Sequence, residues 1–334
     1  MSGADSRALM RREILAQPEV LAAAAAPLAA AGHGLGLDRA RPLWVGGCGD
    51  SLFAAQALAG VLRVEGWDPR PASAAEMLWE APIRPGDGVV GVSISGGTRR
   101  TVEAMERATA LGARTVAVTL DPGSRLGGAC AAVLRLPYTP ISRRTPHSLD
   151  YAMTLLALGA VAGLDAAAME GAAAAMEGAT AEALAEAERA AAELPRDARF
   201  FFLGGGPALG SAGYGAAKLH EAGGLPAWAL EAENACHGAN FAMRPGDVAV
   251  LCGGGGPADR RTVALQPGLR RMGLGTLCAG LDDAPAFHRP FLAALAAQAL
   301  CLAVAEARDL DVTDPGGGSE AAGVQRDWFA WSSG

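Results

Sequence analysis

The chain repeats a short pattern of residues after about 160 positions, and this repeat limits the possible folds more than any other feature. Arg84-Pro-Gly-Asp87 returns unchanged as Arg244-Pro-Gly-Asp247, and an apolar segment follows each copy. Two further pairs match in the same order at nearly the same offset: Leu43-Trp-Val-Gly-Gly47 with Phe201-Phe-Leu-Gly-Gly205, and Leu111-Gly-Ala-Arg-Thr115 with Met272-Gly-Leu-Gly-Thr276. Ordered matches at one offset indicate two copies of one fold, with a period too long for a solenoid.

Each copy alternates short apolar runs with segments of helical periodicity, which is typical of parallel strands covered on both faces by helices. We therefore predict an α/β fold. The expected strands lie near Leu43–Gly46, Gly88–Ser93, Thr115–Leu120, Val133–Leu136, Phe200–Leu203, Asp247–Leu251 and Gly275–Ala279. The segment from Leu164 to Leu194 is rich in alanine and glutamate, so it should form one or two helices between the copies.

Charge and composition exclude several classes of partner. The net charge is −7, and the 28 basic residues form no stripe, so we expect no nucleic-acid binding. The most apolar early stretch, Val20 to Ala31, is interrupted by Pro27 and is too short to span a bilayer. We therefore expect a cytoplasmic protein that does not bind membranes.

The six cysteines follow no spacing that indicates a metal or disulfide site. They are expected to be small, mostly buried apolar side chains, and neither a metal nor another cofactor is predicted. They are Cys48, Cys130, Cys236, Cys252, Cys278 and Cys301.

Ser93-Ile-Ser-Gly-Gly-Thr98 lies where a predicted strand ends and a helix begins. The N-terminus of a helix offers backbone N–H groups and a partial positive charge, and the glycines allow close approach of an anion. The hydroxyls of Ser93, Ser95 and Thr98 could also donate to phosphate oxygens. The alternative is an ordinary strand-to-helix turn with Thr98 as N-cap, and the residues of this segment do not decide between the two.

A second glycine-rich turn, Gly46-Gly-Cys-Gly-Asp-Ser51, follows the first predicted strand. Leu52 stands where the last glycine of a dinucleotide fingerprint would be, so a dinucleotide-binding fold is disfavoured. The Ser93–Thr98 segment lacks the lysine of a Walker loop, which argues against hydrolysis of a nucleoside triphosphate.

These two turns resemble the sugar isomerase (SIS) family, and in particular the isomerase half of glucosamine-6-phosphate synthase, which has two SIS domains in tandem. Gly47-Cys-Gly-Asp-Ser51 resembles the family's G-C-G-T-S turn, and Ser93–Thr98 resembles its S-Q-S-G-E-T phosphate loop. The resemblance extends from Met10-Arg-Arg-Glu-Ile-Leu-Ala-Gln-Pro18, similar to an opening helix, to about Asp314. It implies two flavodoxin-like, three-layer α/β/α domains over residues 1–165 and 166–334.

The resemblance also implies one site for a phosphorylated sugar or amino sugar in each chain, because the second loop, Cys252-Gly-Gly-Gly-Gly256, has no hydroxyls. The expected contacts with the ligand come from Cys48, Gly49, Asp50, Ser51, Ser93, Ser95, Gly96, Gly97 and Thr98.

Lys218-Leu-His-Glu221 lies on a probable helix, and His237 follows sixteen residues after Glu221. Sugar isomerisation needs a proton shuttle between C1 and C2 and an acid that opens the ring, and a carboxylate and a histidine suit these tasks. Without the resemblance, a surface charge and a loop histidine explain these residues better. The family's K-L-K-E and K-H-G motifs imply that Glu221 is the base, with Lys218 close by. They also imply that His237 assists ring opening in the neighbouring subunit of a homodimer.

Several residues depart from the family pattern. Asn234 replaces a glutamate, Ile94 and Gly97 replace the glutamine and glutamate of the phosphate loop, and the tail lacks the synthase's K-S-V-T-V-E. We also expect no glutaminase domain before Met1, so the chain should not draw ammonia from glutamine by itself.

Two other groups of residues have both a functional and a structural interpretation. Arg143, Arg144 and His147 could contact an anionic substrate, although a solvated basic turn is more common. The tail aromatics Trp328, Phe329 and Trp331 could cover the active site, or could pack in the core or in a dimer contact.

The sequence therefore predicts an enzyme that isomerises, deaminates or aminates a ketose or amino-sugar phosphate. The alternative is a phosphosugar sensor without catalytic activity, because SIS domains also serve as ligand-binding modules.

Overall fold

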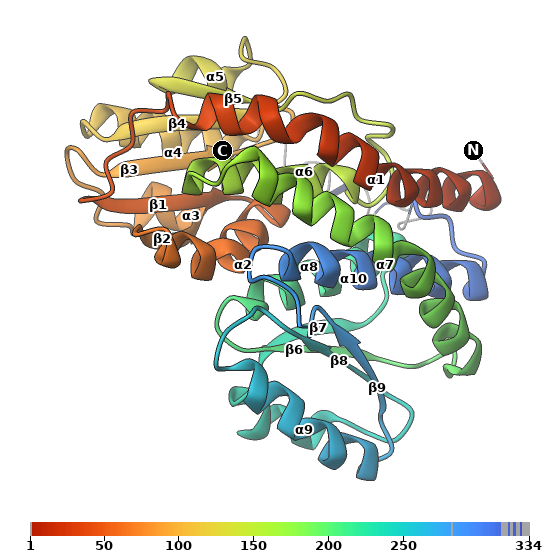
Figure 1. Cartoon of the computed structure of the whole chain (residues 1–334). Coiled ribbons are helices and arrows are strands. Elements are labelled where there is room, and N and C mark those ends of the chain that lie inside the picture. Colours follow the sequence, from red (N-terminus) through yellow and green to blue (C-terminus); the bar gives the residue numbers. More distant parts are fainter. Residues whose placement is uncertain (1, 282, 315–319, 321–322, 325–327, 329–334) are drawn as a thin grey trace. The chain divides into compact units, whose positions relative to one another are not determined.

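The computed structural model describes residues 2–281, 283–314, 320, 323–324 and 328 (Figure 1). The chain forms two compact units, each built from separate stretches of sequence. We call them the N-sheet unit, which includes Val20–Thr139 and Met153–Glu170, and the C-sheet unit, which includes residues 2–19, Pro140–Ala152 and 171–314. The chain passes from one unit to the other within three helices, α1 (Gly3–Gly32), α6 (Leu149–Ala162) and α7 (Ala166–Glu193), and also between Thr139 and Pro140, outside any helix.

The N-sheet unit contains five parallel strands in the order β2-β1-β3-β4-β5. This is the flavodoxin-like order. Every residue of β3 is buried, so both faces of the sheet are covered. The strands are β1 (Pro42–Gly47), β2 (Asp68–Ser73), β3 (Gly88–Val92), β4 (Arg114–Thr119) and β5 (Ala132–Arg135).

Four helices follow the strands of this unit along the chain. They are α2 (Asp50–Val64), α3 (Ala74–Trp79), α4 (Arg99–Ala110) and α5 (Arg125–Ala129). The apolar side of α4 packs on one face of the sheet, where Val102 and Met105 join a core with Trp44 and Val89. Gly91 permits this close packing, because a Cβ at Gly91 would collide with the Met105 side chain.

The C-sheet unit contains four parallel strands in the order β7-β6-β8-β9, which repeats the order of the first four strands of the N-sheet. They are β6 (Phe200–Gly204), β7 (Ala227–Glu231), β8 (Val248–Cys252) and β9 (Gly275–Ala279). The other elements of this unit are α8 (Ala208–Gly223), the short 3₁₀ helices η1 (Asn234–Cys236) and η2 (Ala239–Ala242), α9 (Asp259–Arg271) and α10 (Arg289–Arg308).

The repeated Arg-Pro-Gly-Asp residues form the same turn before β3 and before β8. Asp87 Oδ2 accepts a hydrogen bond from its own turn's Arg84 N–H at 3.0 Å, and Asp247 Oδ2 accepts one from Arg244 N–H at 2.9 Å. In both turns the glycine N–H also donates to a glycine carbonyl before the next strand, at 2.9 Å for Gly86 and 3.0 Å for Gly246. The sequence repeat is thus a repeat of local structure.

The seven predicted strands are all present, and no strand end differs from the predicted end by more than one residue. The prediction missed β2 and β7, which lie at equivalent sheet edges. The sequence of β2, Asp68-Pro-Arg-Pro-Ala-Ser73, has two prolines and no apolar run, since an edge strand needs neither full burial nor every N–H. The connecting segment forms one 28-residue helix, α7, as predicted. Pro27 does not interrupt α1, which continues to Gly32.

Among the residues that the structure describes, two helices, α1 and α10, are long and apolar enough to span a membrane by length and composition. In α10, 78% of the most apolar window is buried inside the protein, which is typical of a core helix. The corresponding fraction for α1 is 39%. The length and apolar composition of these two helices are therefore only weak evidence for a membrane span.

The cysteines are less buried than expected. Cys252 and Cys301 are buried, whereas Cys48 and Cys278 are exposed, because they lie in a turn after a strand and on an edge strand. In the part of the chain that the structure describes, the six cysteines form no disulfide bond, and no group of three His, Cys, Asp or Glu side chains could hold a metal ion.

Asp247→Ala should destabilise the protein by about 3 kcal/mol, because it leaves the Arg199 guanidinium beside the turn without its buried carboxylate. Arg199 Nε and Nη2 donate to Asp247 at 3.0 and 2.6 Å, and the Asp247 side chain is 1% exposed. Urea unfolding followed by circular dichroism measures the loss. Asp197→Ala, which removes an 81% exposed carboxylate 3.1 Å from Arg244, is the control and should change stability by less than about 1 kcal/mol.

The stabilisation by the Arg199–Asp247 pair should also depend on pH. Burial alone would raise the pKa of Asp247, but hydrogen bonds from Arg199 and the Arg244 N–H lower it below 3.8. The stabilisation is therefore present above pH 3.8 and is lost as the pH falls through the folded pKa. Equal losses for Asp247→Ala and Asp197→Ala at neutral pH would contradict the prediction.

Candidate functional site

The loop from Ser93 to Thr98 joins the carboxyl end of β3 to the start of α4. Gly96 has a φ of 64°, a conformation that favours glycine, and a Cβ at this position would collide with the Ser124 side chain. The hydroxyls of Ser93 and Thr98 lie 2.8 Å apart, and Ser95 Oγ accepts from the Gly97 N–H at 3.3 Å. The loop is thus a tight turn with three hydroxyls.

Thr98 is the N-cap residue of α4, as the structural alternative predicted, but its hydroxyl does not cap the helix. It pairs with Ser93 Oγ instead. This differs from an ordinary capped turn, in which the N-cap side chain accepts from a first-turn N–H.

The second glycine-rich turn lies beside this loop. β1 and β3 are neighbours, with Gly47 opposite Val92, so the turn after β1 and the loop after β3 leave the same edge of the sheet. Gly49 has a φ of 53° and precedes α2, which begins at Asp50. Thr101 Oγ1 in α4 lies 3.8 Å from Cys48 Sγ.

This edge is where ligands bind in folds of this type. The strand order reverses between β1 and β3, and α/β sheets bind ligands outside the carboxyl ends of the strands at such a switch point. The structure therefore brings the nine expected contact residues into two adjacent turns, Cys48–Ser51 and Ser93–Thr98.

The equivalent loop of the C-sheet unit already holds a carboxylate. Gly254 and Gly255 N–H donate to the two oxygens of Asp259, each at 3.0 Å, and Arg289 Nη1 lies 3.2 Å from Asp259 Oδ2. An internal anion thus lies at the N-terminus of α9. This supports the expectation that the second loop does not bind a ligand phosphate.

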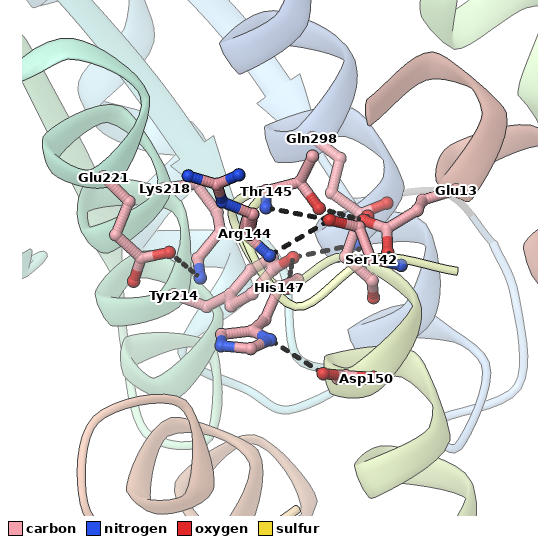
Figure 2. A network of polar contacts seen from close by, with 11 residues as sticks. Glu13, Ser142, Arg144, Thr145, His147, Asp150, Tyr214, Lys218, Glu221 and Gln298 are labelled. Atoms are coloured by element: carbon pink, nitrogen blue, oxygen red, sulfur yellow. Dashed lines mark hydrogen bonds and ion pairs between the residues drawn. The ribbon is translucent and has the colours of Figure 1, made fainter. Parts of the chain in front are cut away.

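Helix α8 carries the pair Lys218 and Glu221. Lys218 Nζ donates to Glu221 Oε2 at 2.6 Å, one helical turn away (Figure 2). The Lys218 side chain is fully buried, whereas that of Glu221 is 41% exposed. The ammonium also lies 5.0 Å from the ring centroid of Tyr214, another α8 residue. A carboxylate that solvent and ligands can reach is thus held by a buried cation.

Tyr214 connects this pair to the N-terminal end of α6. Its ring stacks on Tyr151 with centroids 3.6 Å apart, and its hydroxyl donates to the His147 carbonyl at 3.0 Å. Gln298 Nε2 in α10 donates to the Tyr214 hydroxyl at 2.9 Å. Figure 2 shows the side chains of α8 and the segment before α6 in one polar network.

Glu13 holds the segment between Ser142 and Ser148 in place. Its carboxylate is 3% exposed and accepts from Ser142 N at 3.0 Å, Thr145 Oγ1 at 2.7 Å and Ser148 Oγ at 3.1 Å. Burial raises the pKa of Glu13, and the hydrogen bonds from Thr145 and Ser148 only partly oppose this rise. Sequence reasoning missed Glu13, although it lies in the opening segment that resembles the family.

In the same segment, His147 Nδ1 contacts Asp150 Oδ2 at 2.7 Å, and the side chains of Arg143 and Arg144 are exposed.

Of the three tail aromatics, Trp328 is 70% exposed, so it does not pack in the core. Phe329 and Trp331 lie outside the described residues.

His237 lies between the 3₁₀ helices η1 and η2, at the end of the chain segment that follows β7. Its side chain is 69% exposed, and Nε2 lies 3.3 Å from Glu233 Oε1. Glu233 also pairs with Arg261. The expected action of His237 in a neighbouring subunit stays a prediction, because it concerns a second chain.

The SIS domain family model matches residues 36–162. The matched range includes both turns at the switch point. A curated relative, the N-acetylmuramic acid 6-phosphate etherase of Symbiobacterium thermophilum, is 50% identical over 62 residues, which is 19% of this chain. The matched part spans only 20% of that etherase.

Solved structures resemble this chain over nearly its whole length. The C-terminal domain of glucosamine-fructose-6-phosphate aminotransferase from Francisella tularensis has 17% identity and a TM-score of 0.76, covering 91% of this chain and 97% of that one. A tagatose-6-phosphate ketose/aldose isomerase from Escherichia coli has 17% identity and a TM-score of 0.80, with 92% and 95% covered. A glucosamine-6-phosphate deaminase from Thermotoga maritima has 19% identity and a TM-score of 0.73, with 92% and 97% covered. At these identities the likeness shows the fold.

The wild-type protein should lose stability as the pH rises above 4.5, and Glu13→Gln should remove part of this loss. The folded protein holds the Glu13 proton to a higher pH than the unfolded chain does, since its folded pKa is raised above 4.5. The protonated form is therefore favoured in the fold, and stability falls as the pH rises from 4.5 through the folded pKa. Urea midpoints measured from pH 4.5 to 8 should show this fall in the wild type but less of it in Glu13→Gln. Glu19→Gln, on the exposed side of α1, is the control. Parallel pH curves for wild type and Glu13→Gln would contradict the prediction.

Proposed function

We propose that this chain is an enzyme that moves a proton between C1 and C2 of a hexose or hexosamine 6-phosphate, and so interconverts an aldose and a ketose or deaminates an amino sugar. The observation that carries the proposal is the Lys218–Glu221 pair, in which a buried ammonium bonds to a half-exposed carboxylate at 2.6 Å. The proposed ligand phosphate binds at the Ser93–Thr98 loop.

The pair suits this chemistry. A carboxylate fixed at one oxygen by a cation has a defined direction for its other oxygen, and a positioned base of this kind accelerates proton transfer by about 10²- to 10⁴-fold. A nearby ammonium also stabilises the negative charge that develops on the sugar oxygen during enediol formation. A non-catalytic sensor would not need a buried lysine behind an exposed glutamate.

The substrate class is supported by the loop and by the comparisons. The three hydroxyls and glycines of Ser93–Thr98 suit a phosphate group. The names of the similar proteins given above all refer to 6-phosphates of six-carbon sugars or their derivatives. We therefore propose a 6-phosphate, and no cofactor is needed for the proton transfer.

A second candidate is cleavage of a sugar ether, which the 50% identity to the etherase over 62 residues favours. Incubation with N-acetylmuramic acid 6-phosphate, followed by chromatography of the products, distinguishes the two reactions. We also propose a second SIS domain in tandem, which the resemblance and the repeated strand order support. A homodimer with a shared active site and a cytoplasmic location are further proposals, supported by the resemblance alone.

Replacing Ser95 and Thr98 together by alanine should weaken binding of a sugar phosphate by about 1–3 kcal/mol, because each hydroxyl donates to a charged oxygen. Calorimetry with fructose 6-phosphate and glucosamine 6-phosphate measures the change, and unchanged thermal unfolding shows that the fold survives. Wild-type affinity in the double variant, or equal binding of fructose and fructose 6-phosphate by the wild type, would contradict the assigned phosphate site.

Glu221→Gln should reduce turnover by roughly 10²- to 10⁴-fold with little change in ligand affinity, since it keeps the shape but removes the base. The direct measurement is the incorporation of solvent deuterium at C1 or C2 of the sugar phosphate, followed by NMR. Glu182→Gln, on the exposed surface of α7, is the control and should exchange at the wild-type rate.

The other outcomes of this experiment identify other roles. Exchange that persists in Glu221→Gln would assign the proton transfer to another group, such as Lys218. Binding without exchange by the wild type would show a sensor rather than an enzyme.

A further inference from the structure

His147 forms a dyad with Asp150 in the segment that precedes and begins α6. Nδ1 of the imidazole lies 2.7 Å from Asp150 Oδ2, and the Asp150 side chain is 5% exposed whereas that of His147 is 46% exposed (Figure 2). The carboxylate thus lies in the protein interior, and the ring it holds is partly exposed to solvent.

A buried carboxylate that accepts from Nδ1–H fixes both the orientation and the tautomer of an imidazole. In the neutral ring, Nε2 is then the basic nitrogen. The carboxylate also stabilises the imidazolium that forms when Nε2 takes a proton. This is the arrangement of a histidine that transfers protons.

The dyad is anchored beside the Lys218–Glu221 pair. The His147 carbonyl accepts from the Tyr214 hydroxyl at 3.0 Å, and the ring of the same tyrosine lies 5.0 Å from Lys218 Nζ. The three hydrogen bonds to Glu13 fix the chain on either side of His147, at Ser142, Thr145 and Ser148. A proton-transfer group and the proposed base are thus built around one tyrosine within the C-sheet unit.

His237 lacks this support within the chain. Its ring is 69% exposed, and its partner Glu233 is itself 52% exposed and shared with Arg261. An exposed carboxylate holds an imidazole less firmly than a buried one. Of the two histidines, His147 has the better defined orientation.

We propose that His147, positioned by Asp150, opens the ring of the sugar phosphate within the same chain. This inference rests on the proposed function, because ring opening is useful only if an open-chain sugar then reacts at Glu221. Neutral Nε2 takes the proton from the anomeric hydroxyl, which is O1 in an aldose and O2 in a ketose such as fructose 6-phosphate. The bond between the anomeric carbon and the ring oxygen breaks as the carbonyl forms, and the imidazolium returns the same proton to the ring oxygen. No oxidation or reduction occurs.

Ring opening and closing interconvert the two anomers, so the step can be measured apart from C–H chemistry. Two-dimensional exchange NMR of fructose 6-phosphate reports the rate of anomer exchange, and the Glu221→Gln background prevents further reaction. Catalysed exchange should be present in Glu221→Gln and should fall by about 10²-fold in Glu221→Gln with His147→Gln. His33→Gln, at an exposed position just after α1, is the matched control in the same background and should keep the exchange. No loss with His147→Gln, or an equal loss with His33→Gln, would overturn the proposal.

A substrate that cannot cyclise provides the second measurement and distinguishes a folding defect. 5-Deoxyfructose 6-phosphate lacks the ring hydroxyl and stays open, so it does not need His147. His147→Gln and Asp150→Asn, each made in the otherwise wild-type chain, should lose deuterium exchange with fructose 6-phosphate while retaining it with the 5-deoxy compound. Equal losses with both substrates would show a merely structural role and overturn the proposal.

The two hypotheses fail in different ways. Loss of exchange with the 5-deoxy compound in Glu221→Gln, together with normal ring opening in His147→Gln, would support the proposed function but not the role of His147. If the wild type exchanges no proton with either substrate, the proposed function fails, and this inference fails with it.

Discussion

The burial of the Lys218 ammonium determines much of the C-sheet unit. Moving a charged group from water into the protein interior costs several kcal/mol unless a counter-charge and further polar contacts accompany it. Glu221 supplies the counter-charge one helical turn away, and the face of Tyr214 supplies a further attraction. The 2.6 Å contact with Lys218 Nζ holds one oxygen of Glu221, the residue that we propose as the base, at the buried ammonium.

The packing around this charge depends on small residues. Helix α8 includes Gly210, Ala212 and Gly215, and a Cβ at Gly215 would collide with the ring of Phe202 in β6. Helix α10 packs on the other side, where the Cys301 thiol lies 3.2 Å from the Lys218 carbonyl. The Lys218 side chain is fully buried in this packing, and in such an interior its attraction to Glu221 is stronger than it would be in water.

Most of the sheet architecture could be predicted from the sequence, because central parallel strands are continuous apolar runs and the repeated Arg-Pro-Gly-Asp turn marks equivalent positions. The edge strands β2 and β7 could not, since burial on fewer sides leaves little apolar pattern, as in Asp68–Ser73. The turns at the switch point and the Lys218–Glu221 pair were found from short motifs. The His147–Asp150 dyad was not found, although its members are three residues apart, because the spacing alone does not show that Asp150 is buried. Glu13 was missed because the fold brings it to its partners: it lies 129 residues from Ser142. A local pattern cannot show a contact of that separation.

The two glycine-rich loops show how copies of one sheet order can diverge in function. Backbone N–H groups at the start of a helix need an acceptor. In the C-sheet unit the chain provides it, since Asp259 accepts from Gly254 and Gly255 and is itself held by Arg289. In the N-sheet unit the side chains around α4 make different contacts: Thr98 pairs with Ser93, and Arg99 and Arg100 both pair with Glu103 farther along the helix. A carboxylate within the loop would compete with any external anion for the same N–H groups. The copy that uses its own acidic side chain gains local stability, whereas the loop of the other copy offers the hydroxyls and glycines at which we propose that the ligand phosphate binds.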